Sequence, residues 1–249
     1  MFLKKMVMAA LLAVVPALAS AEDYVMYETM YLKPDAAKWA ELMDKLAAHN
    51  KKFHAKGPYR AHVQRVVNGP RTGQLVWVMG PCTFSHLDSR PSGDPHDSDW
   101  MTNVVALLKG VGENEYWRLD EKRSYQPNTD DHPKLRVRFF HIERAEMYRF
   151  NQLLEKMNTV AEKKKYPNRM SVYRPRFWNG SGPDVATVWS FDKWAELDRD
   201  MDFEKDYEEV HGDGSWQLFL EEFRDVVNNA YDEYREVVPE LGGASPSQD

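Results

Sequence analysis

Two arginines in one alternating segment, Arg136 and Arg138, are the first residues whose spacing suggests chemistry. They alternate with Leu135, Val137 and Phe139, which is typical of a strand with two different faces. If the apolar residues pack against helices, both guanidinium groups point to the opposite face, where they could hold a carboxylate. The pattern predicts a semi-polar cavity for a small anionic or aromatic molecule. A solvated face or a layer of salt bridges is the alternative.

The same alternation brings side chains of other predicted strands to this face. Tyr27, His62, Gln64 and Tyr173 would add hydroxyl, imidazole and amide groups, all of which form hydrogen bonds. The predicted ligand site therefore consists of Tyr27, His62, Arg136, Arg138 and Tyr173.

Two loops rich in His and Asp, GDPHDSDW and HGDGSW, form a second candidate. Imidazole and carboxylate groups can bind metal ions. The secondary candidates are His96, Asp97, His211 and Asp213. However, Asp99 and Ser215 directly precede helical Trp residues, where N-caps belong. Capping and solvation explain most of these residues, so we predict neither a metal site nor a cofactor.

Sharp catalytic motifs are missing from the sequence. It contains no G-x-S-x-G, Walker loop, H-E-x-x-H, paired C-x-x-C or strand-following G-x-G-x-x-G, which argues against the enzyme classes that use them. The one cysteine, Cys82, cannot form an internal disulfide. It is expected to be a buried, inert thiol; a nucleophile or a link between two chains is the alternative.

The first residues have the pattern of a secretory signal peptide. Lys4 and Lys5 precede an apolar run that ends near Leu18, and Ala19 and Ala21 follow in an A-x-A arrangement. This pattern predicts cleavage after Ala21 and a periplasmic or secreted protein. Nothing later is apolar enough to cross a membrane.

The overall charge is negative, with 33 Lys and Arg against 39 Asp and Glu, a net charge of −6. Loss of the two signal-peptide lysines would make it −8. Non-specific nucleic-acid binding needs a basic face, so nucleic acid is not an expected partner.

The sequence segments that would position these residues occur twice along the chain. Val67–Asp88 and Trp178–Asp198 both contain Asn-Gly, an apolar run centred on a Trp, and a closing Leu-Asp. Asn-Gly favours a tight hairpin. The predicted hairpin strands are Tyr59–Val67 with Leu75–Met79, and Met170–Phe177 with Val185–Phe191.

Helical stripes flank each hairpin. Trp39, Leu42, Met43 and Leu46 mark the first helix of the first copy, and His49 and His54 are expected on its solvated end. Residues 101–108 and 216–231 also follow helical spacing. The first copy then has a closing strand in EYWRLDEKRSY, whereas EYREVVPEL is ambiguous between the end of a helix and a strand.

The order β-α-β-β-α-β therefore occurs twice, and each unit would form an antiparallel sheet with helices on one side. We predict an α+β fold in which two tandem ferredoxin-like repeats form a single-chain pseudo-dimeric α/β barrel. The expected segments are a signal peptide at 1–21, repeats at 22–126 and 134–240, a linker at 127–133 and a disordered tail at 241–249.

YVMYETMYLKPDAAKWAELMDKL, together with this element order, resembles the dimeric α/β-barrel superfamily, particularly its NIPSNAP-like and antibiotic-biosynthesis-monooxygenase-like members. That superfamily includes cofactor-independent monooxygenases, chlorite dismutases and ligand-binding proteins. Chlorite dismutases would imply a haem-ligating His on the first helix of the second repeat. The matching stretch, EKMNTVAEKKKYP, has none.

Three functions are compatible with the resemblance. We expect an exported protein that binds a small organic molecule between two sheets. A cofactor-independent monooxygenase-like enzyme is the alternative. An oligomeric interaction protein, assembled through a sheet edge as a homo-oligomer, is a further one.

Overall fold

The computed structural model describes residues 24–127, 132–178, 180–199 and 202–243. The predicted signal peptide, and parts of the predicted linker and tail, lie outside these residues. The fold is α+β, with an antiparallel eight-stranded sheet as its centre. The strands are β1 (Met26–Pro34), β2 (Ala61–Asn68), β3 (Leu75–Cys82), β4 (Leu108–Leu119), β5 (Lys134–Ile142), β6 (Met170–Pro175), β7 (Val185–Phe191) and β8 (Val227–Val237).

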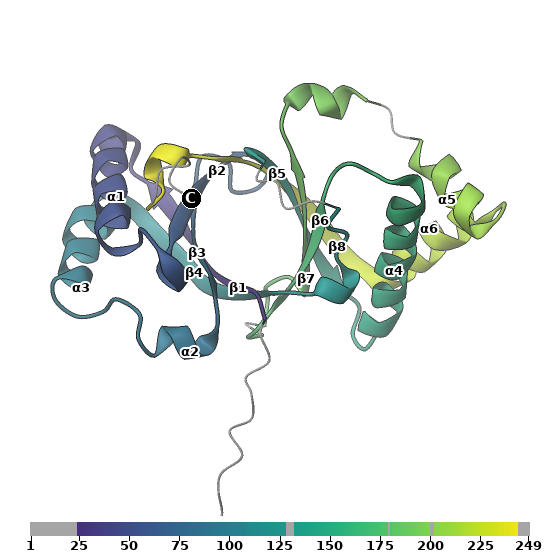
Figure 1. Ribbon diagram of the computed structural model, residues 1–249, viewed down its shortest axis with the longest axis horizontal. Coiled ribbons are helices and arrows are strands. Elements are labelled where there is room, and N and C mark those ends of the chain that lie inside the picture. Colours follow the sequence, from purple (N-terminus) through teal and green to yellow (C-terminus); the bar gives the residue numbers. More distant parts are fainter. Residues whose placement is uncertain (1–23, 128–131, 179, 200–201, 244–249) are drawn as a thin grey trace, which may run out of the picture.

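The sheet closes on itself in the order β1-β3-β2-β8-β5-β7-β6-β4. Strands β1 to β4 form one half of the ring and β5 to β8 the other. The halves are joined where β2 pairs with β8 and where β4 pairs with β6. Figure 1 looks through this ring and shows helices on its two opposite sides. One face of every strand is therefore turned toward the inside of a barrel, and the other toward helices or solvent.

Each half carries its own layer of helices. The first has α1 (Trp39–Phe53) and the short helices α2 (Phe84–Leu87) and α3 (His96–Asp99), whereas the second has α4 (Met147–Lys164), α5 (Phe203–His211) and α6 (Ser215–Val226). Two separate cores lie between helices and sheet. The first contains Leu32, Leu42, Leu46, Val63, Trp77 and Val104. The second contains Phe150, Leu153, Val172, Val185, Tyr207 and Phe219. Within the described residues, no helix is both long enough and apolar enough to span a bilayer.

The second-half prediction of a helix through residues 216–231 is wrong at its end. Helix α6 ends at Val226 and β8 begins at Val227. Val227 and Tyr231 fit helical spacing, but residues 227–231 pair with β5, and β2 pairs with β8 further along, from Tyr234 to Val237. Tertiary pairing has therefore overridden the local pattern. The ambiguous segment EYREVVPEL begins as part of β8.

The first-half helix predicted over residues 101–108 is replaced by shorter pieces. A π-helical turn (Trp100–Val104) follows α3, then a 3₁₀ turn (Val105–Leu107), and β4 begins at Leu108. Strand β4 therefore starts earlier than predicted and ends at Leu119. The β2–β3 hairpin turn is where the Asn-Gly pair predicts it. Gly69 has φ +115°, and a Cβ there would lie 2.5 Å from the Asp232 carbonyl oxygen, so glycine is required.

Candidate functional site

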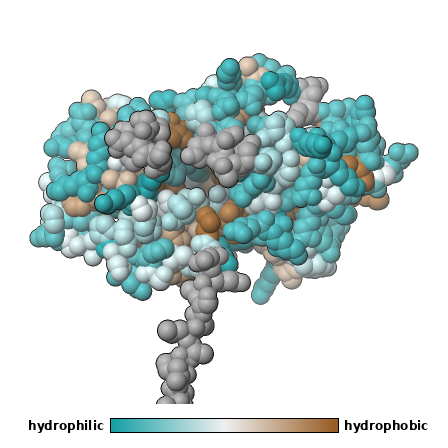
Figure 2. Space-filling view, viewed as in Figure 1, coloured by the Kyte–Doolittle hydropathy of each residue, from teal (hydrophilic) through white to brown (hydrophobic). Residues whose placement is uncertain are grey.

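The inside of the barrel holds a cavity of about 710 Å³. Its wall is largely aliphatic and aromatic, with a few polar groups, the usual composition of a small-molecule site. The lining residues include Tyr27, Tyr31, His62, Gln64, Val76, Val78, Trp117, His132, Leu135, Val137, Phe139, Arg169, Tyr173, Val188 and Arg235. On the face shown in Figure 2 the surface is mostly hydrophilic, and hydrophobic atoms gather toward the middle of the molecule.

Basic and imidazole groups gather at one end of this cavity. The strand registers put the starts of β1, β2, β5 and β6 at the same end of the barrel. Arg60, His132 and Arg169 precede β2, β5 and β6, and all three line the cavity. A negatively charged group entering from this end would meet positive charge.

A hydrogen-bonded cluster around Glu233 lies toward the opposite end. Glu233, which is 0% exposed, accepts hydrogen bonds from Arg71 Nε at 2.5 Å, Arg235 Nη2 at 2.7 Å and Tyr31 Oη at 3.0 Å. Arg235 also donates to Gln64 Oε1 at 3.1 Å. The Arg71 guanidinium lies 3.9 Å from the centre of the Tyr31 ring. The cluster joins the two halves, because Tyr31, Gln64 and Arg71 come from the first and the other two residues from the second.

The charges of this cluster are mutually compensated. Burial alone would raise the pKa of Glu233, but Arg235 and Arg71 outweigh burial and lower that pKa below its ordinary value. Burial raises the pKa of Tyr31, with Glu233 adding to the rise. Glu233 is thus an ion and Tyr31 a neutral donor at pH 7, so the cluster is a compensated polar network.

The predicted ligand site is only partly where the sequence suggests. Tyr27, His62 and Tyr173 line the cavity, as does Gln64. The Tyr27 and Tyr173 rings meet edge to face with centroids 6.1 Å apart, so they join β1 and β6 across the seam between the halves. Their role in ligand binding stays a prediction.

The orientation predicted for Arg136 and Arg138 is wrong. Both side chains lie on the outside of β5 and share the carboxylate of Asp232, with Nη2 to Oδ2 distances of 2.7 and 2.8 Å. Leu135, Val137 and Phe139 line the cavity instead. The alternation identified two faces correctly, but the barrel interior is itself apolar, so the apolar face of β5 is the inner one.

An Asp–His pair at the open end was missed by the sequence analysis. His132 Nδ1 lies 2.9 Å from Asp192 Oδ1, and because a carboxylate only accepts, Nδ1 carries the hydrogen. In the neutral ring, His132 Nε2 then carries a lone pair and no hydrogen. It is buried and has no hydrogen-bond partner among the described residues, while the ring lines the cavity. This arrangement suits a general base. Sixty residues separate the two partners, so no local motif could reveal them.

The secondary candidates do not form one site. His96 and Asp97 lie on α3 of the first half, whereas His211 ends α5 of the second half. The His211 ring nitrogen Nε2 lies 3.1 Å from the Lys156 carbonyl oxygen. Asp213 lies in the turn between α5 and α6. Ser215 is not an N-cap, because it is the first residue of α6 and follows Gly214. Asp99 precedes the helical turn that begins at Trp100, but its side chain makes no capping hydrogen bond there.

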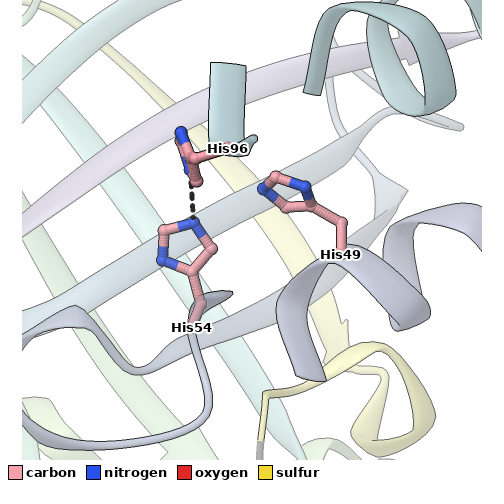
Figure 3. Close-up of side chains that lie close together, drawn as sticks. All are labelled: His49, His54 and His96. Carbon is pink, nitrogen blue, oxygen red and sulfur yellow. Dashed lines mark hydrogen bonds between the residues drawn. The ribbon is translucent and has the colours of Figure 1, made fainter. Parts of the chain in front are cut away.

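Three histidines meet between α1 and α3. His49, His54 and His96 each offer one ligand atom, and these atoms lie within 4.8 Å of one another. Figure 3 shows the three rings gathered together, with His54 and His96 joined Nε2 to Nε2 at 3.2 Å. His49 and His54 are 1% and 4% exposed, so their expected position on a solvated helix end is wrong. No local pattern could reveal this cluster, because His96 comes from a segment 42 residues after His54.

Each ring of this three-histidine cluster has an acceptor at Nδ1. His49 Nδ1 lies 2.7 Å from Asp99 Oδ2, His54 Nδ1 lies 3.0 Å from the Tyr59 carbonyl, and His96 Nδ1 lies 2.8 Å from Asp97 Oδ1. Acceptor-only partners require that all three Nδ1 atoms carry hydrogen. Burial lowers the pKa of His49, and it lowers that of His54 to about 4. These two rings are therefore neutral at pH 7, with bare Nε2 atoms.

Cys82 is buried. Burial and the nearby charge of Glu28 raise the pKa of its thiol to about 11, so little thiolate forms at neutral pH. This environment agrees with an inert thiol.

The second half does not fit the haem site that a chlorite dismutase-like fold would imply. Helix α4 carries no His or Cys, and its Tyr148 side chain is 62% exposed. The space between α4 and the sheet is filled by Phe150, Leu154 and Val172 with their neighbours. Helix α4 therefore provides no axial ligand of the expected kind, and its packing against the sheet leaves no room for a macrocycle.

No protein-family model and no curated protein matches the sequence. Solved structures do match the fold. An anthrone oxidase-like protein is 11% identical, with a TM-score of 0.57 over 87% of this chain and 92% of its own. A protein of Lactobacillus acidophilus NCFM assigned as a monooxygenase is 10% identical, with a TM-score of 0.53 over 91% and 100%. Chlorite dismutase from Candidatus Nitrospira defluvii, in complex with imidazole, is 11% identical, with a TM-score of 0.54 over 86% and 92%.

At such identities the likeness concerns the fold, and reaction chemistry does not follow from it. The shared architecture covers nearly the whole described chain and combines an antiparallel eight-stranded sheet with helices. The chain shares its fold with these monooxygenase-assigned, anthrone oxidase-like and chlorite dismutase proteins.

Proposed function

We propose that the protein is a monooxygenase-like enzyme that holds a small aromatic, anionic molecule in the barrel cavity and needs no cofactor. The observation that carries this proposal is the His132–Asp192 pair, whose unpartnered Nε2 belongs to the wall of a cavity of about 710 Å³. The similarity to a monooxygenase-assigned protein and to an anthrone oxidase-like protein supports it.

The cavity wall suits a flat, oxidisable substrate. Trp117, Phe139 and Tyr173 offer aromatic contacts, which favour edge-to-face or offset packing against another ring. Arg60 and Arg169 at the open end could hold an acidic substituent or a phenolate. Tyr31 and Arg235 of the Glu233 cluster would provide polar contacts at the other end of the substrate.

The proposed reaction oxidises an acidic CH₂ group with molecular oxygen. His132 Nε2 takes one proton from the CH₂, and Asp192 stabilises the resulting imidazolium. The carbanion transfers one electron to O₂, and the two radicals combine into a peroxide anion. The imidazolium returns the proton, and loss of water leaves a carbonyl. The balance is R₂CH₂ + O₂ → R₂C=O + H₂O, so the substrate supplies all the electrons.

Oxygen uptake tests this proposal. Purified protein is mixed with a panel of hydroxyanthrones and polyphenols in the presence of a chelator, and O₂ consumption is followed with an electrode. We expect uptake by the wild type and a drop of about 100-fold or more in His132→Gln, the upper part of the usual general-base contribution. Glu236→Gln, on the outside of β8, is the matched control and should keep full activity.

Thermal shift with the same panel separates the enzyme from the binding protein. His132→Gln should still be stabilised by the substrate, because the base is not needed for binding. Stabilisation of the wild type without oxygen uptake would leave ligand binding as the function and refute the enzyme. Absence of both effects would refute the cavity as a functional site.

Three other expectations remain proposals. Export through a signal peptide cleaved after Ala21 is tested by N-terminal sequencing of the mature protein. The equal order of strands in the two halves supports a tandem duplication, with repeats at 22–126 and 134–240. A homo-oligomer is supported by the exposed Phe177 and Trp178, 63% and 81% exposed, and is tested by analytical ultracentrifugation of the wild type and of Trp178→Ser.

A further inference from the structure

We propose that His49, His54 and His96 bind a divalent first-row transition metal ion, with zinc as the simplest occupant. This site lies outside the barrel, between α1 and α3. It is separate from the cavity and from the proposed oxidation, and its metal would be structural.

The spacing of two ring nitrogens is the first support. His54 Nε2 and His96 Nε2 are 3.2 Å apart, and both rings have their hydrogen on Nδ1. Two bare lone pairs at this distance repel, so either a proton shared as a hydrogen bond or a metal ion must lie between them. Tetrahedral zinc with Zn–N bonds of ~2.0–2.1 Å would place its nitrogens roughly 3.3–3.4 Å apart. The two nitrogens are thus already at the separation that this ion requires.

The third ring provides an independent observation. His49 Nε2 is buried and has no hydrogen-bond partner among the described residues. Leaving a buried polar atom unsatisfied destabilises a fold. Figure 3 shows the His49 ring turned toward the other two, so an ion bound by His54 and His96 would satisfy it.

The outer shell has the chemistry of a metal site. Histidine ligands in proteins usually donate their second N–H to a carboxylate or a carbonyl, and here Asp99, the Tyr59 carbonyl and Asp97 accept from His49, His54 and His96. The two carboxylates would balance the two positive charges of the ion. Arg90, a nearby positive charge, is compensated by Glu28 at 3.1 Å.

The position of the site suggests what the metal does. Helix α3 is four residues long, too short to be stable by itself. His96 is the first residue of α3, His49 is on α1, and His54 follows α1 on the way to β2. One ion would therefore tie an irregular segment to the helix layer of the first half, as structural zinc does in other small folds.

Metal loading of the whole protein tests this inference. Protein made metal-free by dialysis against a chelator is mixed with zinc, desalted, and analysed for metal content and thermal midpoint. We expect one zinc per chain and a midpoint that rises by several degrees and falls again with EDTA, because the ion binds only the folded state. His96→Gln should weaken zinc binding by more than the roughly 10–100-fold typical of outer-shell changes.

The matched control is His211→Gln, which removes the histidine at the end of α5 in the second half and should leave zinc binding unchanged. Circular dichroism checks that both variants are folded. Cobalt(II) added to the wild type should give the visible absorption of a four-coordinate nitrogen site, a readout that needs no variant. Zinc absent from the wild type after desalting, or equal binding by both variants, would overturn the proposal.

Discussion

The helix layers of the two halves differ although their strands follow the same order. In the second half, α5 and α6 are 9 and 12 residues long. They bury an aromatic cluster in which the ring centroids of Tyr207 and Phe219 are 5.1 Å apart. In the first half, the four-residue α3 is followed by π and 3₁₀ turns, and three histidines gather between α3 and α1.

The difference shows two ways to hold a helix layer on one kind of sheet. Long helices present an apolar stripe, and burial of that stripe is non-directional and large in sum. A segment of one helical turn has no such stripe, so it depends on a few directed contacts. A single substitution should therefore have a different consequence in each layer. In the apolar layer it should lower the free energy of unfolding, and in the histidine layer it should lower metal affinity.

The largest effect is expected in the apolar layer. Phe150, which is 1% exposed, packs between α4 and the sheet. Phe150→Ala should lower the free energy of unfolding by about 3–5 kcal/mol, because it removes buried contacts and leaves a cavity. Urea denaturation measures this loss. Tyr148→Ala, on the exposed side of α4, is the control and should cost far less. Equal losses in the two variants would mean that this layer is not a packed core.

A second large effect is expected where the halves meet. Glu233→Gln leaves Arg71 and Arg235 without their shared carboxylate, and removing one partner of a buried pair costs about 3–5 kcal/mol. Glu236→Gln on the same strand breaks a part-exposed pair with Arg65 and should cost about 0–1 kcal/mol. If both variants are equally stable in urea, the buried cluster does not hold the halves together.

The same residue predicts a pH dependence. The folded-state pKa of Glu233 lies below its ordinary value of 4.5, so its contribution is fully present above that value and is lost as the pH falls through the folded-state pKa. The stability gap between wild type and Glu233→Gln should be full at pH 7 and shrink below pH 4.5. Urea denaturation at a series of pH values measures the gap, and a constant gap would contradict this assignment of charge.

An intermediate effect is expected in the polar layer. Asp97→Asn keeps His96 in place but weakens the acceptor at its Nδ1, and outer-shell changes of this kind lower metal affinity by roughly 10–100-fold. Asp213→Asn in the second-half loop should leave affinity unchanged. Zinc titration with a competing chelator measures both. If the two variants bind zinc alike, Asp97 has no role in the site.

The sequence could predict elements but not all of their faces. Tyr27 and His62 lie on the side of the sheet that the alternation predicts, because their strands have clearly apolar opposite faces. For β5 the alternation predicted the wrong inner face, because the cavity wall is apolar and is lined by Leu135, Val137 and Phe139. In β8 the charged Glu233 and Arg235 face inward. The segment therefore lacks the apolar alternation of a strand, and its apolar residues fit helical spacing instead.

The sites themselves depended on contacts between distant segments. His132 and Asp192 meet because β5 pairs with β7, and Lys134 lies opposite Phe191 in that register. His49, His54 and His96 meet because a loop after β3 folds back onto α1. A histidine that looks solvated by its neighbours in sequence can be buried by a segment far along the chain, and periodicity carries no information about that segment.

The smallest effect on stability is expected for the arginines on the outside of β5, which differ from the arginines at the cavity wall. Arg138 is 41% exposed and shares Asp232 with Arg136, so Arg138→Ala leaves one pair in place and should cost at most about 1 kcal/mol. It should not change the thermal shift caused by an aromatic acid, whereas Arg169→Ala, at the cavity wall, should reduce that shift. If Arg138→Ala reduces the thermal shift and Arg169→Ala does not, the ligand binds on the outside of β5 and not in the cavity.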